Sequence, residues 1–388
     1  MLAASAELQL LRAAVRQNSD GVALRLRLAR LLNTLDMFSE NIELLNENNA
    51  INATLPARLL LISAYFARNA DGDNARAKAE AENAYALVQT DADRSYVLAE
   101  HAKAHLRLGD DEAAFPLLWR ALELAPNNVN AFKRLSFELM HRQKPEEVLG
   151  LIDRLRQQGA GHSRLLAAQM MALSASGDSQ AAQQLLGESH FVHQRILEVP
   201  SGWADLAAFN TALTKEINSN PGMRFERYGT SSQKAWRVDH PATSDTPAVS
   251  ALLLQIAKVA AAHAVSCAEH AHIWSSDCPQ TAVLRSWCVI TEGDGYENWH
   301  MHPEGWMSGG YYVEVPDAVA GGVDDAGCLA FGMPGGLIGD DAAQNFAQIQ
   351  IRPLPGMLTL FPSHAYHRTF PHNAQGRRMC IAFDICPF

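Results

Sequence analysis

The sequence predicts a two-part α+β protein in which a solenoid of helical hairpins precedes a closed antiparallel β domain. Apolar residues recur every three or four positions through the first half, which is typical of amphipathic helices. From residue 281 the period becomes two, and turns rich in Gly and Pro separate short apolar runs. A chain of 388 residues also exceeds the ~250–300 residues that one hydrophobic core serves. We expect helical repeats at 1–198, a connecting segment with some strand at 199–250, and a β domain at 251–388 with its core at 281–388.

Composition excludes several classes of protein. With 48% hydrophobic and 19% charged residues the chain is expected to fold rather than to be disordered. A net charge of -10 argues against nucleic acid as a partner. No apolar run approaches the ~20 residues of a membrane helix, and no signal peptide is visible at the amino terminus, so we expect a cytoplasmic protein without a membrane partner. The six cysteines show no CxxC pair and are expected to be reduced thiols.

A 34-residue period supports the helical half. Gly109, Gln143 and Gly177 occupy successive turns between helices. Buried-looking positions follow in step, at Ala114, Val148 and Ala182 and then at Leu118, Ile152 and Leu186. Pro126 stands where a helix must stop. With less regular units at 24–47 and 59–88, the pattern gives about five hairpins and resembles the tetratricopeptide repeat. Such a solenoid could recruit substrate, form a homodimer or act only as a scaffold.

The second half is expected to form a sandwich or jelly roll. An alanine-rich helix at 248–269 precedes it and is expected to pack on the sheet. Many short strands at this spacing are typical of closed antiparallel folds. The expected strands are 281–291, 309–315, 328–331, 346–351, 357–361, 366–370 and 377–386.

Three histidines in this half form a candidate metal site. His300 and His302 lie two apart in the run NWHMHP, so on an extended segment their side chains share one face. His367 follows the strand at 357–361. Two close ligands and one distant ligand can hold one side of a metal and leave the other side open, which is typical of a catalytic site.

Arg378 is a candidate anion anchor. It begins the apolar strand RMCIAF, eleven residues after His367, where an unpaired charge would be expensive to bury. A guanidinium facing the metal would suit a carboxylate bound end-on. For the neighbouring Arg377 we prefer a surface salt bridge.

These motifs resemble a family. The runs GYENWHMHP from 295, WMSGGYYVEVP from 306 and PGMLTLFPS from 355, together with His367 and RMCIAF, look like those of the 2-oxoglutarate- and Fe(II)-dependent oxygenases that often follow tetratricopeptide repeats in bacteria. The resemblance covers about residues 225–388. It implies a double-stranded β-helix and a dioxygenase that hydroxylates a C–H bond with Fe(II), O2 and 2-oxoglutarate, releasing succinate and CO2.

Carried over residue by residue, His300, His302 and His367 would bind iron and Arg378 would bind the 2-oxoglutarate carboxylate. One of Tyr311 and Tyr312 would face the co-substrate, although the sequence does not say which. The remaining candidates are Ser308 and Asn298 as hydrogen-bond donors near the site, and Trp299, Trp306 and His364 as substrate contacts.

Two departures from the wider superfamily affect the chemistry. His302 stands where most members have a carboxylate, so either three histidines bind iron or one lies behind the metal. Cys380 replaces a serine that is often found two residues after the arginine. Gly310 replaces a branched residue, which we interpret as a packing change. Glu304, Asp324 and Asp325 are weaker carboxylate candidates, and His372 is interpreted as a bystander.

Three alternatives stay open at this point. A three-histidine cupin-type oxygenase or isomerase would use the same ligands without 2-oxoglutarate. An interaction scaffold with an inactive barrel would bind no iron. An oxygenase acting on a free small molecule would not need the repeats for recognition, whereas one acting on a peptide or protein would.

Overall fold

The computed structural model describes residues 4–18 and 20–388. Grouping by contacts divides the chain into two units, one of Met1–Glu138 with Gln157–Ala160 and the other of Leu139–Arg156 with Gly161–Phe388. Each unit is described by itself. The sequence-based bounds at residues 198 and 250 stay predictions.

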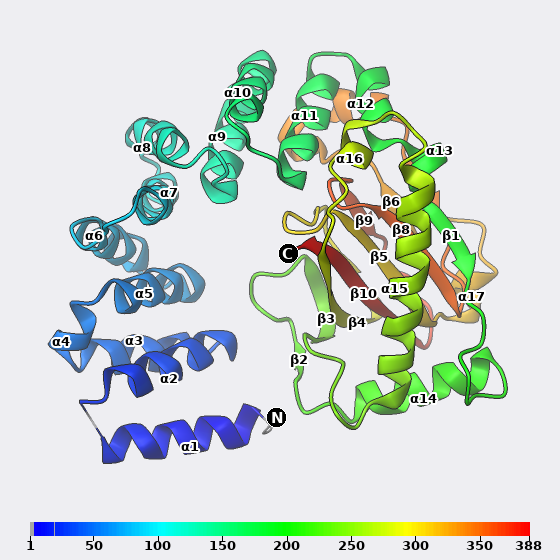
Figure 1. Ribbon diagram of the computed structural model, residues 1–388, viewed down its shortest axis with the longest axis horizontal. Helices are drawn as coiled ribbons and strands as arrows, with labels where there is room; N and C mark the ends of the chain where they lie inside the picture. The colour runs from blue at the N-terminus through cyan, green and yellow to red at the C-terminus, as the bar shows by residue number, and fades with distance from the viewer. Residues whose placement is uncertain (1–3, 19) are drawn as a thin grey trace. The chain divides into compact units, whose positions relative to one another are not determined.

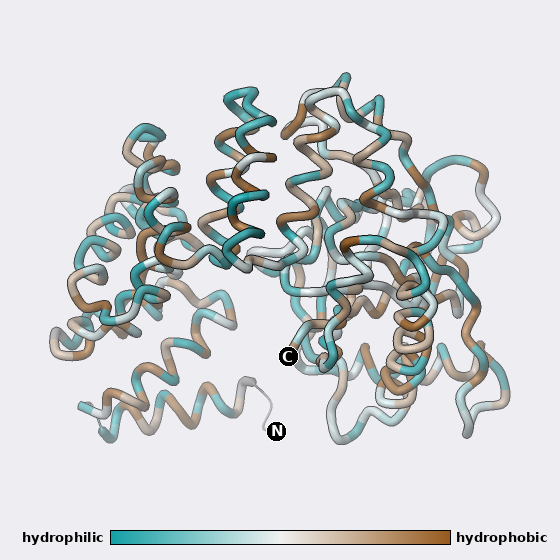
Figure 2. The backbone as a smooth tube through the Cα atoms, turned by 45° about the horizontal axis from the view of Figure 1, so that its top comes forward, coloured by the Kyte–Doolittle hydropathy of each residue, from teal (hydrophilic) through white to brown (hydrophobic). Residues whose placement is uncertain are grey.

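The first unit consists of helices joined by short turns (Figure 1). Its helices are α1 (Ala4–Gln17), α2 (Val22–Thr34), α3 (Phe38–Asn46), α4 (Asn49–Asn52), α5 (Leu55–Arg68), α6 (Asp73–Tyr85), α7 (Asp91–Arg107), α8 (Asp111–Leu124) and α9 (Val129–His141), of which the last crosses into the second unit. The tube in Figure 2 alternates between hydrophobic and hydrophilic residues along these helices. Amphipathic helices of this kind bury their apolar side by packing against neighbouring hairpins.

The 34-residue period is confirmed as a hairpin repeat. Gly109, Gln143 and Gly177 lie in the turns after α7, α9 and α11 with φ of 76°, 56° and 87°. This left-handed conformation ends a helix and suits glycine best. All six residues predicted in step with these turns are buried, with exposed fractions of 1% or less. The helix α8 ends at Leu124, two residues before Pro126, as predicted.

The second unit begins with helices and ends in a β domain. Its helices are α10 (Pro145–Gln157), α11 (Ser163–Ala175), α12 (Ser179–Leu186), α13 (Glu188–Phe191), α14 (Leu206–Asn218), α15 (Pro247–Cys267), α16 (Ile273–Ser276), α17 (Asp317–Ala320), α18 (Gly335–Ile338) and α19 (Asp340–Asn345). The last three are short helices in segments that we expected to be turns.

Two antiparallel sheets form the β domain. The strands are β1 (His193–Ile196), β2 (Met223–Phe225), β3 (Ser232–Val238), β4 (Ala282–Glu297), β5 (Met307–Glu314), β6 (Leu329–Phe331), β7 (Ile349–Ile351), β8 (Met357–Pro362), β9 (His367–Thr369) and β10 (Arg377–Pro387). The larger sheet has the order β1-β8-β5-β10-β4-β3-β2 and the smaller one β7-β6-β9. The rings of Phe331 on β6 and Phe361 on β8 lie 5.0 Å apart, so the sheets face each other as a jelly roll requires.

All seven predicted strands are confirmed. Two corrections concern the end of the strand β4 and the strand β1, which was not predicted. The strand predicted to end at Thr291 continues through the glycines to Glu297, because β3 pairs with it across a register shift between Gln233 and Ala235. Residues 193–196, which we expected to be helical, form β1 because their backbone pairs with the edge strand β8.

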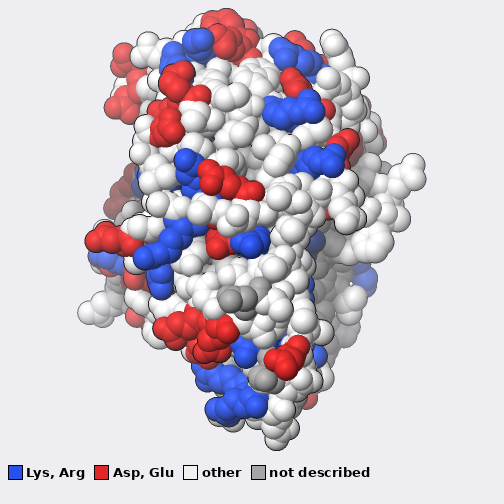
Figure 3. All heavy atoms as spheres, turned by 90° about the vertical axis from the view of Figure 1, so that its left-hand side faces the viewer, with Lys and Arg blue, Asp and Glu red and all other residues white. Residues whose placement is uncertain are grey.

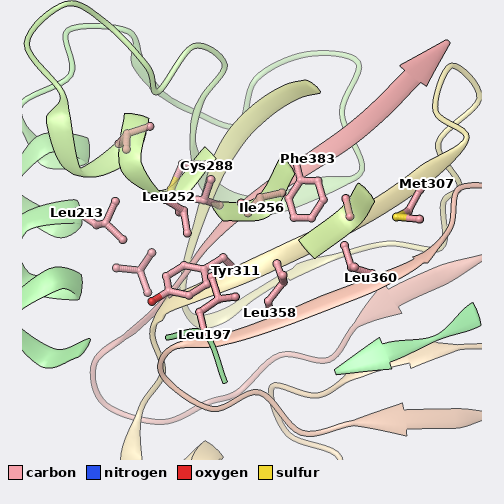
Figure 4. Close-up of a cluster of buried hydrophobic side chains, with 14 of the residues drawn as sticks. Leu197, Leu213, Leu252, Ile256, Cys288, Met307, Tyr311, Leu358, Leu360 and Phe383 are labelled. Atoms are coloured by element: carbon pink, nitrogen blue, oxygen red, sulfur yellow. The ribbon is translucent and has the colours of Figure 1, made fainter. Parts of the chain in front are cut away.

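A hydrophobic core fills the space between the larger sheet and the helices α14 and α15. Figure 4 shows Leu252 and Ile256 of α15 packed over Cys288, Leu358 and Phe383 of the sheet. The expectation that no segment is long and apolar enough to cross a membrane is wrong for α15, whose 21 residues pass that test by length and composition. One face of α15 packs on the sheet, which accounts for its buried apolar residues, whereas Leu254 and Val265 on the other face are 66% and 72% exposed.

Charges of both signs are mixed on the face shown in Figure 3. Lysine and arginine side chains there are interspersed with aspartate and glutamate. The visible face therefore offers no continuous basic surface of the kind that binds a phosphate backbone.

Candidate metal centre

The structure brings together the three histidines singled out from the sequence. His300 and His302 lie in the segment after β4, and His367 is the first residue of β9. His300 and His367 form an antiparallel bridge in which each backbone N–H donates to the other's carbonyl at 2.9 Å. The N–H of His302 donates to the carbonyl of Ser363 at 3.0 Å. One potential ligand nitrogen of each histidine lies within 4.8 Å of the other two.

Hydrogen bonds fix which ring nitrogen can bind a metal. The Nδ1 of His300 contacts the carbonyl of Asn298 at 2.7 Å, and the Nδ1 of His367 contacts the carbonyl of Ala365 at 2.9 Å. The Nδ1 of His302 contacts Oδ1 of Asp384. An Nδ1–H that donates in this way leaves Nε2 as the free donor atom, which is the usual arrangement of metal-binding histidines. All three rings are therefore oriented to present Nε2.

Burial and neighbouring charges change the pKa values of the three histidines, lowering two of them and raising the third. Burial lowers the pKa of His300, with a further contribution from the charge of His302. Burial and the two other imidazoles lower the pKa of His367 well below its usual value. For His302 burial also acts downward, but Asp384 outweighs it and the pKa is raised. Two of the three rings are thus kept neutral, the form that binds metals.

Arg378 lies buried on the inner face of the larger sheet, beside Tyr312. Its side chain is 3% exposed, and its guanidinium carbon lies 5.0 Å from the centre of the Tyr312 ring. Its Nε has no hydrogen-bond partner. Burial acts to lower the pKa of Arg378, but Tyr312 and Cys380 outweigh it, so the guanidinium stays charged. A buried cation with an unused donor is suited to an anionic ligand.

Gly310 and Cys380, two positions at which the sequence departs from the wider superfamily, lie next to each other. A Cβ added at Gly310 would lie 2.7 Å from Sγ of Cys380. The thiol of Cys380 therefore fills space that a side chain at 310 would need. Burial raises the pKa of Cys380 to about 12, so this sulfur is a neutral thiol beside Arg378.

Three of the predicted contact residues lie away from the metal-facing side. Tyr311 packs in the core under α14, and its hydroxyl donates to Oδ1 of Asn210 at 2.7 Å. Strand alternation therefore leaves Tyr312 as the inward tyrosine. The indole of Trp306 stacks on Trp274 at 4.5 Å within the same core. These placements correct the expectation that Tyr311 could reach the co-substrate and that Trp306 contacts substrate.

His364 is also placed differently from the expectation of a substrate contact. It is fully buried, and its Nε2 contacts the carbonyl of Leu185 at 2.9 Å. Burial lowers the pKa of His364 to about 4. The ring therefore holds the end of α12 against the β domain as a neutral side chain.

The remaining predicted residues surround the histidines. Ser308 is fully buried and bonds both Ser363 and Asp384. Asn298 orients His300 through its backbone carbonyl, whereas its amide oxygen caps the N–H of Trp299. Trp299 is half-buried, with the guanidinium carbon of Arg368 5.6 Å from its ring.

The acidic candidates do not join the histidines. Glu304 forms an ion pair with Arg285, and Asp324 caps a turn through the N–H of Ala326. Asp325 is exposed, and His372 contacts the carbonyl of Thr291 at 3.3 Å. Among the described residues, the one cluster with metal-ligand spacing is that of His300, His302 and His367.

Asp384 is the residue that sequence reasoning missed. It is the only acidic residue of β10, and it lies six residues after Arg378. An even spacing on a strand places both side chains on one face. That signal was available in the sequence and would have put a carboxylate on the inner face.

Comparisons with known proteins agree with this site. Residues 285–384 match the family model described as "Putative 2OG-Fe(II) oxygenase". This part of the chain is similar to that family, which is one of oxidoreductases. No curated protein is similar enough to match the chain.

Several solved structures resemble parts of the chain weakly. A prolyl-4-hydroxylase from Pseudomonas putida is 14% identical with a TM-score of 0.34, over 56% of this chain and 99% of that chain. A Trichoplax adhaerens prolyl hydroxylase in complex with a hypoxia inducible factor peptide fragment is 11% identical with a TM-score of 0.35, over 54% and 91%. YrrB, a TPR protein with an unusual peptide-binding site, is 16% identical with a TM-score of 0.34, over 46% and 90%.

Proposed function

We propose that the protein is a 2-oxoglutarate- and Fe(II)-dependent dioxygenase that hydroxylates a C–H bond of a peptide or protein. The observation that carries the proposal is the presence of two buried features within the β domain. Three histidines present Nε2 within ligand spacing, and a buried arginine has an unused Nε beside Tyr312. The first feature fits a divalent metal with open positions, and the second fits a carboxylate.

The histidines would hold the metal through Nε2. Fe(II) and 2-oxoglutarate would supply the oxidising chemistry, in which decarboxylation to succinate and CO2 accompanies the reduction of O2 and the hydroxylation of the substrate. Phe361 and Phe331 pack 4.8 and 6.1 Å from the His367 ring, which excludes water on that side. The protein therefore contributes binding, orientation and a dry wall.

Arg378 and Tyr312 would hold the far carboxylate of 2-oxoglutarate. The guanidinium supplies charge and the unused Nε–H, while the phenol lies over it. Burial raises the pKa of Tyr312 to about 12, so its hydroxyl keeps its proton and can donate. Cys380 supplies a weaker donor than the serine it replaces.

The helical repeats support a peptide or protein substrate. Stacked hairpins form extended concave surfaces that commonly bind other chains. Homodimerisation through the same helices is the competing role for them. All six cysteines are free thiols in the structure, which supports a cytoplasmic location.

One observation favours a second candidate function. Three neutral ligands are also a set that a cupin-type metal oxygenase would use without 2-oxoglutarate. That candidate leaves the buried charge of Arg378 without a partner. The two candidates therefore differ in whether 2-oxoglutarate binds.

The test is an anaerobic titration of the full-length protein with Fe(II) and then with 2-oxoglutarate, followed by visible absorption. We expect a metal-to-keto-acid charge-transfer band, lost in His367→Ala. Arg378→Gln should need at least ~10-fold more 2-oxoglutarate, because a charged hydrogen bond contributes ~1.5–3 kcal/mol. Arg377→Gln is the matched control, since its guanidinium pairs with Glu314.

The outcomes separate the candidate functions. Iron binding without the band would favour the three-histidine enzyme that does not use 2-oxoglutarate. Absence of iron binding would make the β domain an inactive scaffold. An equal loss in Arg377→Gln and Arg378→Gln would refute the assigned anchor.

A further inference from the structure

We propose that Asp384 is a positioning residue for the metal, which fixes the His302 ring and supplies through it the negative charge that three histidines lack. The inference rests on the metal site of the proposed function. It concerns a side chain that does not reach the metal itself, since Asp384 touches His302 at Nδ1, on the opposite edge of the ring from Nε2.

Hydrogen bonds from two segments fix Asp384, and a third segment supports them. Its Oδ1 accepts from Nδ1 of His302 and from the hydroxyl of Ser308 at 2.7 Å. The Ser308 hydroxyl lies 2.6 Å from that of Ser363, and both serines are fully buried. Ser363 also accepts the backbone N–H of His302. Ring and backbone of His302 are therefore held by one connected network, which sets the direction of Nε2.

Among the residues that the structure describes, no cationic side chain other than His302 is available to pair with the Asp384 carboxylate. The side chain of Asp384 is 13% exposed, and no lysine or arginine forms an ion pair with it. A nearly buried carboxylate is costly without a cationic partner. When His302 carries a divalent metal on Nε2, its ring becomes that partner.

The three imidazoles are not equivalent in this respect. His300 and His367 donate to neutral backbone carbonyls, whereas His302 donates to a carboxylate. A carboxylate behind a ligating histidine makes that histidine a stronger donor, and its loss typically costs 10–100-fold in metal affinity.

Glu297 is a second carboxylate whose charge acts on the site. Its charge acts on His300, His302 and Arg378, but its carboxylate receives the hydroxyls of Ser231 and Ser232 at 3.5 and 3.4 Å. It makes no hydrogen bond to a candidate ligand. Glu297→Gln therefore serves as a matched control, which removes a nearby charge without touching a ligand.

The experiment is an anaerobic titration of the full-length protein with Co(II) alone, by calorimetry and by visible absorption of the bound ion. Asp384→Asn keeps the shape and one acceptor oxygen but removes the charge. We expect it to bind Co(II) 10–100-fold more weakly and to shift the Co(II) absorption, while Glu297→Gln stays near wild type. A change below ~10-fold with an unshifted spectrum would overturn the inference.

A second variant covers the case in which Asp384→Asn folds poorly. Ser308→Ala keeps the Asp384 charge but removes one of the two hydrogen bonds to its Oδ1, so it should also weaken Co(II) binding. Co(II) binding by Ser308→Ala equal to that of the wild type would refute the inference. Wild-type protein that fails to bind Co(II) would refute both this inference and the metal site. Co(II) binding without the Fe(II)–2-oxoglutarate band would refute the proposed function and leave the role of Asp384 standing.

Discussion

Gly310 and Cys380 make a prediction that can be worked through from the structure. Gly310→Ala would place a Cβ 2.7 Å from Sγ of Cys380, with no other atom within 4 Å. Overpacking of this kind costs ~1–3 kcal/mol. Alanine also makes the unfolded chain less flexible than glycine does, which stabilises the folded state by ~0.4–1 kcal/mol and offsets part of this cost. We therefore expect Gly310→Ala to lower the free energy of unfolding by about 1–2 kcal/mol.

Removing the sulfur should remove the cost. In a Cys380→Ala background the new Cβ meets no atom, so the double variant should recover about 1–2 kcal/mol relative to additivity. Urea unfolding followed by tryptophan fluorescence measures this, because six of the seven tryptophans follow residue 200. Gly309→Ala is the control, since its Cβ would lie 2.2 Å from the backbone oxygen of Thr359. Additivity in the double variant, or equal rescue of Gly309→Ala by Cys380→Ala, would refute the reasoning.

Two further predictions separate the neighbouring tyrosines and use the buried His364. Tyr312→Phe should raise the 2-oxoglutarate concentration needed for the charge-transfer band by about 10-fold. Tyr311→Phe should leave that concentration unchanged. It should instead lower the free energy of unfolding by about 1 kcal/mol, because the hydrogen bond to Asn210 is lost. Equal effects on the band would contradict the assignment. Because burial lowers the pKa of His364 to about 4 from 6.5, the unfolded chain binds more protons between these values. Stability should therefore fall as pH drops from 6.5 toward 4, by about 3 kcal/mol, and His364→Gln should flatten that dependence in urea midpoints at pH 7 and 4.5.

The sequence predicted the fold well because its two periods are local properties. Hairpin turns with a residue at positive φ recur every 34 positions, and strands alternate between Gly- and Pro-rich turns. The sequence did not predict which side chains from distant parts of the chain pack against each other. Trp306 is an aromatic residue next to the histidine motif and was predicted to contact substrate, yet it stacks on Trp274, which lies 32 residues earlier in the chain. Only the packing of α16 against the sheet decides that.

The site shows the same division between local and non-local information. The parity of His300 and His302 placed both rings on one side, and the same parity separates Tyr311 from Tyr312 once the inward face of β5 is known. That face is set by pairing of β5 with β10, in which Gly310 lies opposite Ala382. Pairing registers depend on residues more than sixty positions apart, so the sequence alone left the tyrosines undecided.

For Asp384, strand alternation predicts the face on which the side chain lies but not the residue that it contacts. Arg378, Cys380 and Asp384 alternate along β10, so one rule places all three on the inner face. The rule does not say which end of the strand meets His302. That follows from the register Asp384–Ser308 and from the bond of His302 to Ser363, which bring the carboxylate and the ligand together. A strand that carries a cation at one end and an anion at the other can thus serve a carboxylate and a metal on the same face.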